Sequence, residues 1–255
     1  MPNDQEPQAA HRRLIYAIGF FELTHALGLL AMIVLLLPGL SPHLSLDARV
    51  RYVTEHVTSW RIGWISWQLS ALSDAWLSFA LLAWTRATGV RAAERWALAA
   101  VPLLVLALVP DQYAEVRLIT DFTHAMASEA WLEQLREHMR LSGIWACLAY
   151  TSMTACWIRA SHHFELSSPQ PSSSRGRWAE GSVLLAFLGA AIANHFAWHA
   201  TGENRYAFDW AVACNAYAFT GLLMSVGAIA VRARARSPLR GFRSKPARAE
   251  GPLGR

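Results

Sequence analysis

The stretch FELTHALG, residues 21–28, lies inside an apolar run that extends over residues 14–40. A helix needs about 20 residues to cross a hydrocarbon core about 30 Å thick, so this run is long enough to span a membrane. Glu22 and His25 stand within the run. An ionisable residue is costly in lipid and normally faces the protein interior or a water-filled cavity. The stretch therefore predicts a membrane-spanning helix that turns polar groups toward other helices.

The composition of the whole chain indicates the same class. Hydrophobic residues make up 54% of the 255 residues, and charged residues only 16%, where a soluble domain carries about 25% charged residues. Several further apolar runs follow the first, which predicts an all-α, polytopic membrane helix bundle whose main partner is the lipid bilayer. The net charge of +5 comes with no recognised nucleic-acid-binding pattern, so no nucleic acid partner is expected. The only lysine is Lys245, far from any apolar run, which excludes a retinal Schiff base inside the bundle.

The apolar runs predict about six transmembrane helices in one domain, residues 12–232. We expect them at residues 12–40, 61–84, from 95 to beyond 109, 143–158, 178–198 and 208–231. Two segments between them, 41–60 and 129–141, alternate apolar and charged residues at helical spacing, as amphipathic interfacial helices do. Residues 1–11 and 233–255 are polar or basic and are expected to be disordered tails.

Arginines set the expected orientation. The C-terminal tail after the last run is strongly basic, with Arg234, Arg236, Arg240, Arg243, Lys245 and Arg248. By the positive-inside rule this tail is cytoplasmic, and six spans then place the N-terminus on the same side, with both amphipathic segments outside. The expected location is a bacterial cytoplasmic (inner) membrane. The tail is also expected to contact anionic lipid, at about 1 kcal/mol per basic residue near the surface.

A first candidate site lies toward the inner side of the predicted bundle. The second predicted span has a polar residue at every fourth position, namely Ser66, Ser70, Asp74 and Ser78. At 1.5 Å rise per residue, Glu22 and Asp74 come to a similar depth, roughly 10–15 Å from the inner face, with His25 close by. Glu22, His25 and Asp74 therefore form a candidate catalytic group, either a proton relay or a general acid/base pair. The alternative is a hydrogen-bonded network that only locks the first two spans together.

A second candidate site lies toward the outer side. His195 and His199 are four residues apart on one predicted span, and Asp111 and Glu115 are four apart on another. Helical rise places both pairs roughly 25 Å from the inner face, and Asp209 opens the last span at nearly that level. Two histidines with carboxylates on facing helices are a ligand set for a divalent metal such as Zn, Fe or Mn. The alternative is a hydrogen-bonded network at the outer interface, wetted by headgroup water.

Three functions remain open from these residues. The first is a membrane-embedded enzyme that uses the outer histidines and carboxylates, with or without a metal, on a lipophilic small-molecule substrate. The second is a transporter or proton-coupled membrane binding protein that uses Glu22, His25 and Asp74. The third is a structural or assembly protein without chemistry. The sequence lacks GxSxG and HExxH motifs, so any reaction is expected to be metal-assisted or acid/base chemistry.

Overall fold

A computed structural model describes residues 5–121, 128–165, 174–200 and 203–235, and these residues form helices and short connections. The elements in chain order are α1 (Gln5–Ala31), η1 (Met32–Leu36), α2 (Leu37–Leu40), α3 (Leu46–Glu55), α4 (Val57–Thr88), α5 (Arg91–Thr120), α6 (Ser128–His138), η2 (Met139–Ala146), α7 (Cys147–Glu165), α8 (Ser174–His195), η3 (Phe196–Ala200) and α9 (Arg205–Ala235). The η elements are π-helical turns: η1 and η2 each join two α-helices without a break, and η3 continues α8 at its C-terminal end. The all-helical class predicted from the sequence is therefore confirmed for the described residues.

Within the described residues, five helices are long and apolar enough to cross a membrane. They cover residues 5–40, 91–120, 129–163, 180–199 and 205–234. Length and composition therefore fit a multi-pass integral membrane protein. The helix α4 is just as long, at 32 residues, but it is not among the five, because its serines, Gln68 and Asp74 lower its mean hydropathy.

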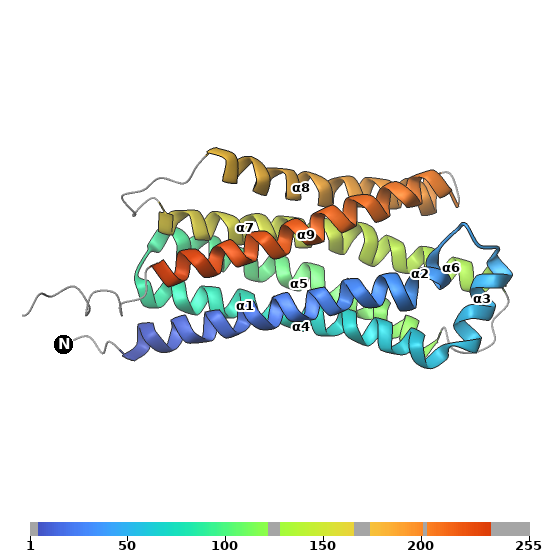
Figure 1. Ribbon diagram of the computed structural model, residues 1–255, viewed down its shortest axis with the longest axis horizontal. Coiled ribbons are helices and arrows are strands. Elements are labelled where there is room, and N and C mark those ends of the chain that lie inside the picture. Colours follow the sequence, from blue (N-terminus) through green and yellow to red (C-terminus); the bar gives the residue numbers. More distant parts are fainter. Residues whose placement is uncertain (1–4, 122–127, 166–173, 201–202, 236–255) are drawn as a thin grey trace, which may run out of the picture.

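The long helices run side by side as an elongated bundle (Figure 1). The start of α1 and the end of α9 lie at one end of the bundle, on the left in Figure 1, and α2, α3 and α6 lie at the opposite end. Arginines near the helix ends gather at the first end, which we call the basic end: Arg12, Arg13, Arg86, Arg91, Arg95, Arg159, Arg232 and Arg234. We call the opposite end the capped end.

An apolar cap closes that opposite end. Its core includes Trp60, Trp131 and Trp198, which are fully or almost fully buried. Arg49 of α3 is completely buried, pairs with Glu203, and lies with its guanidinium 5.6 Å from the ring centroid of Trp131. This arrangement ties α3 and α6 to the connection before α9.

Several element boundaries differ from the predicted ones. Residues 5–11, expected to be disordered, form the first turns of α1. The segment 129–141, expected to be a separate interfacial helix, continues through η2 into α7, because a π-helical turn carries the chain forward without a stop. The segment 41–60 contains the short helix α3, and its last residues already belong to α4. The tail 236–255 lies outside the described residues.

Candidate functional site

Helices α1 and α4 pack face to face through small polar residues. Thr24 Oγ1 donates to Ser73 Oγ at 2.9 Å, and Ser70 Oγ donates to the Thr24 carbonyl at 3.0 Å. Gly28 allows this approach, because a Cβ at that position would lie 2.9 Å from Ser70 Oγ. These four residues, Thr24, Gly28, Ser70 and Ser73, form what we call the α1–α4 seam. The serine stripe of the second span does face the interior, as predicted, at Ser70, Asp74 and Ser78.

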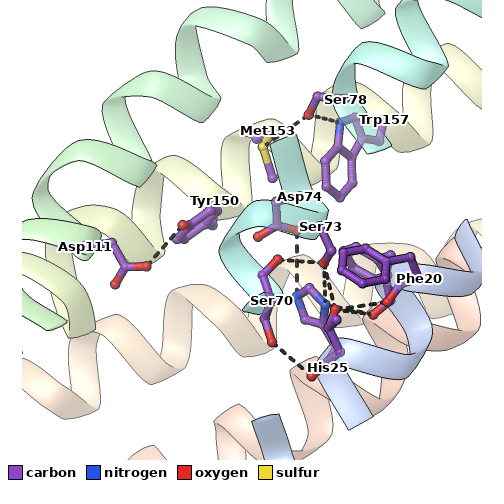
Figure 2. Close-up of polar contacts among 12 residues, drawn as sticks. Phe20, His25, Ser70, Ser73, Asp74, Ser78, Asp111, Tyr150, Met153 and Trp157 are labelled. Atoms are coloured by element: carbon purple, nitrogen blue, oxygen red, sulfur yellow. Dashed lines mark hydrogen bonds and ion pairs between the residues drawn. The ribbon is translucent and has the colours of Figure 1, made fainter. Parts of the chain in front are cut away.

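His25 and Asp74 meet beside this seam (Figure 2). Both side chains are buried, and His25 Nε2 lies 3.6 Å from Asp74 Oδ1. His25 Nδ1 lies 3.0 Å from the Phe21 carbonyl oxygen, which accepts only, so Nδ1 carries a proton. Nε2 then faces the carboxyl group of Asp74. Two acceptors would repel each other, so this contact is favourable only when either the imidazole or the carboxyl carries one more proton. The pair is therefore built to hold a proton.

Glu22 does not join this pair. Its side chain is half-buried, and its Oε1 lies 3.3 Å from the position that a Cβ on Gly227 of α9 would occupy. Three helical residues turn a side chain through about 300°, so Glu22 and His25 point to neighbouring faces of α1. Of the candidate catalytic group, the structure brings together His25 and Asp74 and places Glu22 against α9.

A second polar group surrounds Asp111 of α5. Tyr150 on α7 donates its hydroxyl to Asp111 Oδ2 at 3.1 Å, and Ser142 on η2 donates to the other oxygen. Glu115 lies one helical turn further along α5, is also buried, and accepts from Gln112 Nε2 at 3.1 Å. Figure 2 shows Tyr150 between Asp111 and Asp74. The tyrosine thus lies between the two polar groups and is hydrogen-bonded to Asp111.

Both groups line one interior cavity of about 260 Å³. Two imidazoles, three carboxyls and a phenol face it: His25, His138, Asp74, Asp111, Glu115 and Tyr150. The phenol of Tyr150 lies close enough to all three carboxyls for their charges to act on it. Among the described residues that line the cavity, none is Lys or Arg. The cavity therefore gathers acidic groups without an arginine or lysine to balance them.

The predicted outer metal set does not come together. Asp111 and Glu115 line the cavity, whereas Asp209 is exposed and forms an ion pair with His43, with Oδ1 and Nε2 2.8 Å apart. His195 is exposed. Within the described ranges, no group of three or more His, Cys, Asp or Glu is placed to hold a metal ion. The predicted Zn, Fe or Mn site thus gains no support from the structure.

The reason lies in the faces of α8. Asn194 is buried, donates to the Gly143 carbonyl at 3.0 Å and lines the cavity. His195 follows it and is turned about 100° further around the helix, away from the interior. The rings of His195 and His199 stack with centroids 6.1 Å apart, and the charges that act on His199 include those of Arg140 and Glu137. Matching depth along the helices was therefore not enough to predict a shared site.

Three cavity residues were not singled out from the sequence, namely Ser142, Tyr150 and His138. Ser142 lies within the π-helical turn η2 and Tyr150 lies in α7, so the rotation between their side chains differs from that of a regular α-helix. His138 lies in the segment 129–141, which was expected to be an interfacial helix, yet it is 5% exposed and packs edge-on against Trp64 with ring centroids 4.9 Å apart. Polar residues on successive turns of one α-helical face would have indicated that these residues share a site. The π-helical turn changes which residues share a face, so this pattern is not visible in the sequence.

Comparisons with protein-family models, with curated proteins and with solved structures found no match to this chain. The geometry of the cavity is therefore the evidence for its function.

Proposed function

We propose that this chain is a proton-coupled membrane binding protein, whose cavity takes up a lipophilic small molecule and exchanges protons with it. One observation carries the proposal: Asp74, Asp111 and Glu115 face a single cavity whose described lining has no Lys or Arg. Burying an unpaired charge in an apolar interior costs several kcal/mol. The acidic groups of the cavity therefore hold protons, and a ligand that brings charge into the cavity changes the number of these protons.

The individual contacts support different roles for the carboxyls. Asp111 accepts hydrogen bonds from two hydroxyls, Ser142 and Tyr150, which stabilises its ionised form. Asp74 has the imidazole of His25 as its partner, and that pair holds one proton. Two like charges one helical turn apart repel, so Glu115 beside an ionised Asp111 favours its neutral form. The three carboxyls thus have different hydrogen-bond partners within one cavity.

The proposal includes six membrane spans, with α4 as the sixth, and both termini on the cytoplasmic side. Support comes from the position of α4 between α1 and α5 and from the arginines at the basic end. The measurement is labelling of single cysteines in a background without the three native cysteines. Leu44→Cys at the capped end and Arg91→Cys at the basic end are expected to react with an impermeant maleimide from opposite sides of a vesicle. Labelling of both from one side would contradict six spans.

Infrared difference spectroscopy tests the proton store. In purified protein in lipid nanodiscs, a step from neutral to alkaline pH is expected to remove a protonated-carboxyl band. At least one of Asp74→Asn, Asp111→Asn and Glu115→Gln reduces the band, because each removes one cavity carboxyl. Asp209→Asn is the matched control, since this carboxyl is exposed and outside the cavity. A wild-type protein with no protonated carboxyl at neutral pH would overturn the proposal.

A second function, a membrane-embedded acid/base enzyme, is favoured by the His25–Asp74 pair at the cavity wall, with nitrogen and oxygen 3.6 Å apart. An imidazole next to a carboxyl can take and return a proton during a reaction. Mass spectrometry of lipid extracts incubated with the protein tests this function. A product formed by wild type and not by Asp74→Asn would favour the enzyme, and recovery of unchanged ligand favours binding.

A further inference from the structure

We infer that the cavity receives a lipophilic amine, which enters sideways from the membrane between η1 and α9. The inference rests on the proposed function and names the class of molecule that the site takes. It is carried by an opening in the wall, by an aromatic lining, by polar atoms that lack partners, and by the acidic charge of the cavity.

The cavity opens through the side of the bundle. Ile33 in η1 and Val212 in α9 line it, and they are 56% and 41% exposed. A residue that lines a cavity and is also exposed marks its mouth. The straight part of α1 packs against α9, but η1 and α9 hardly touch, and Figure 1 shows α9 diverging from α1 toward the capped end. In the proposed orientation this opening faces the outer half of the bilayer, so an apolar molecule reaches it without crossing water.

Aromatic rings form much of the inner wall. Trp67 lies against Phe219 with ring centroids 5.1 Å apart, and Phe219 also meets Phe187 at 5.7 Å. All three line the cavity, as does Trp64. The face of an aromatic ring attracts a cation, and cages of such rings recognise alkylammonium groups. Aromatic faces beside carboxyls are therefore suited to an amine rather than to an acid.

Two buried polar atoms at the cavity have no partner in the described part of the chain: Nδ1 of His138 and Nε1 of Trp64. These residues are 5% and 2% exposed. The His138 imidazole already hydrogen-bonds the backbone of Ala114, so its other nitrogen is left as a free acceptor. Buried polar groups are normally satisfied, and an unsatisfied one calls for a missing partner. The N–H group of an amine would donate to the His138 nitrogen and satisfy it.

The size of the cavity fits one end of an amphiphile. A volume of about 260 Å³ is slightly below the usual range for small-molecule pockets, which begins at about 300 Å³. The amine end would fill this space, and its apolar tail would lie in the mouth beside Ile33 and Val212. A positive charge placed here neutralises the acidic lining and displaces protons from it.

The titratable groups that face the amine come from α1, α4, α5, α6 and α7. They are His25 on α1, Asp74 on α4, Asp111 and Glu115 on α5, His138 on α6, and Cys147 and Tyr150 on α7. Since protons and the amine compete for the same carboxyls, amine affinity is expected to rise as the pH increases. The affinity of a neutral molecule of equal length is expected to change little.

The test uses three probes of equal chain length, a brominated alkylamine, alkyl alcohol and fatty acid, added to protein in nanodiscs. Bromine quenches nearby tryptophan fluorescence, and the difference between wild type and Trp67→Phe isolates the cavity signal. We expect the amine to quench Trp67 at lower concentration than the alcohol or the acid. Asp74→Asn is expected to weaken amine binding about tenfold, because a hydrogen bond to a charged group is lost. Asp209→Asn is the matched control and leaves binding unchanged.

A separate variant tests the entry route between η1 and α9. Val212→Trp fills the mouth and is expected to slow amine association, whereas Val231→Trp, exposed on the same helix near the basic end, does not. Quenching of Trp67 by alcohol and amine at equal concentrations would overturn the amine inference, as would an unchanged amine affinity in Asp74→Asn. Both results leave the protonated-carboxyl band untouched, so they are distinguishable from a failure of the proposed function, which is the absence of that band.

Discussion

The α1–α4 seam and the cavity use similar polar side chains next to each other, yet they satisfy them differently. In the seam, Thr24 and Ser73 bond to each other, and Ser70 bonds to the backbone of the facing helix. In the cavity, three carboxyls share a few hydroxyl and amide donors and an imidazole, while Nδ1 of His138 has no partner among the described residues. A satisfied polar group holds helices together, whereas an unsatisfied one is available to a ligand or a proton.

The seam and the cavity also differ in their contributions to stability. A hydrogen bond between membrane helices contributes about 0.6 kcal/mol on average, so the seam acts mainly by close packing around Gly28. Three buried carboxyls destabilise the bundle by more than such bonds can offset, unless protons or a ligand neutralise them. The structural alternative, in which every polar group serves only helix packing, therefore explains the seam better than it explains the cavity.

The largest effect is expected from Gly28→Leu, which would force the seam apart. A side chain at this position meets Ser70 Oγ and the ring of Trp67, with 2.9 Å and 3.3 Å left for the first carbon. Overpacking of this kind costs about 3 kcal/mol. The midpoint of thermal unfolding in detergent is the measurement.

Gly19→Leu is the matched control on the same helix, because a Cβ at Gly19 meets no atom within 4 Å. Equal unfolding midpoints for the two variants would show that the seam does not depend on close approach at Gly28.

The sequence predicted the helices and the seam well, because both depend on local patterns. Run length and hydropathy located the long helices, and the small and polar residues of 21–28 indicated the contact with α4. The depths calculated from helical rise differ for Asp74 and Asp111. For this reason, the sequence predicted that they belong to two separate sites. The cavity joins them because it extends along α1, η1 and α2 from His25 to Leu40, roughly 22 Å of helix.

The rest depended on rotation around helix axes, which depth does not reveal. A single residue decides that Asn194 faces the cavity and His195 faces outward. The π-helical turn η2 shifts the face of every residue after it, which brings Tyr150 toward Asp111. The rotation of each helix depends on packing across the bundle, so it could not be predicted from local patterns in this sequence.

An intermediate effect is expected from exchanging the two cavity aspartates for asparagine. Asp111→Asn is expected to lower the free energy of unfolding by about 1–2 kcal/mol, because the two hydroxyls of Ser142 and Tyr150 lose a charged acceptor. Asp74→Asn is expected to change it by less than about 0.5 kcal/mol, since the amide can donate to His25 Nε2. Chemical denaturation of both variants at neutral pH measures the difference. A larger loss for Asp74→Asn would mean that the His25 pair, and not the Asp111 group, stabilises the fold.

A small effect is also expected from Ser73→Ala, which removes one hydroxyl from the seam. Thr24 Oγ1 keeps a bond to the Phe20 carbonyl at 3.0 Å, so only the bond across the seam is lost, about 0.6 kcal/mol. Ser152→Ala is the control, because this exposed hydroxyl bonds only to its own helix. The loss of unfolding free energy in Ser73→Ala is expected to be the same at acidic and neutral pH, because the seam hydroxyls do not titrate. The loss in Asp111→Asn is expected to shrink at acidic pH, because the wild-type carboxylate then takes up a proton. A Ser73→Ala effect that follows pH in the same way would show that the seam and the cavity act as one network through His25, whose Nδ1 lies 3.4 Å from Ser73 Oγ.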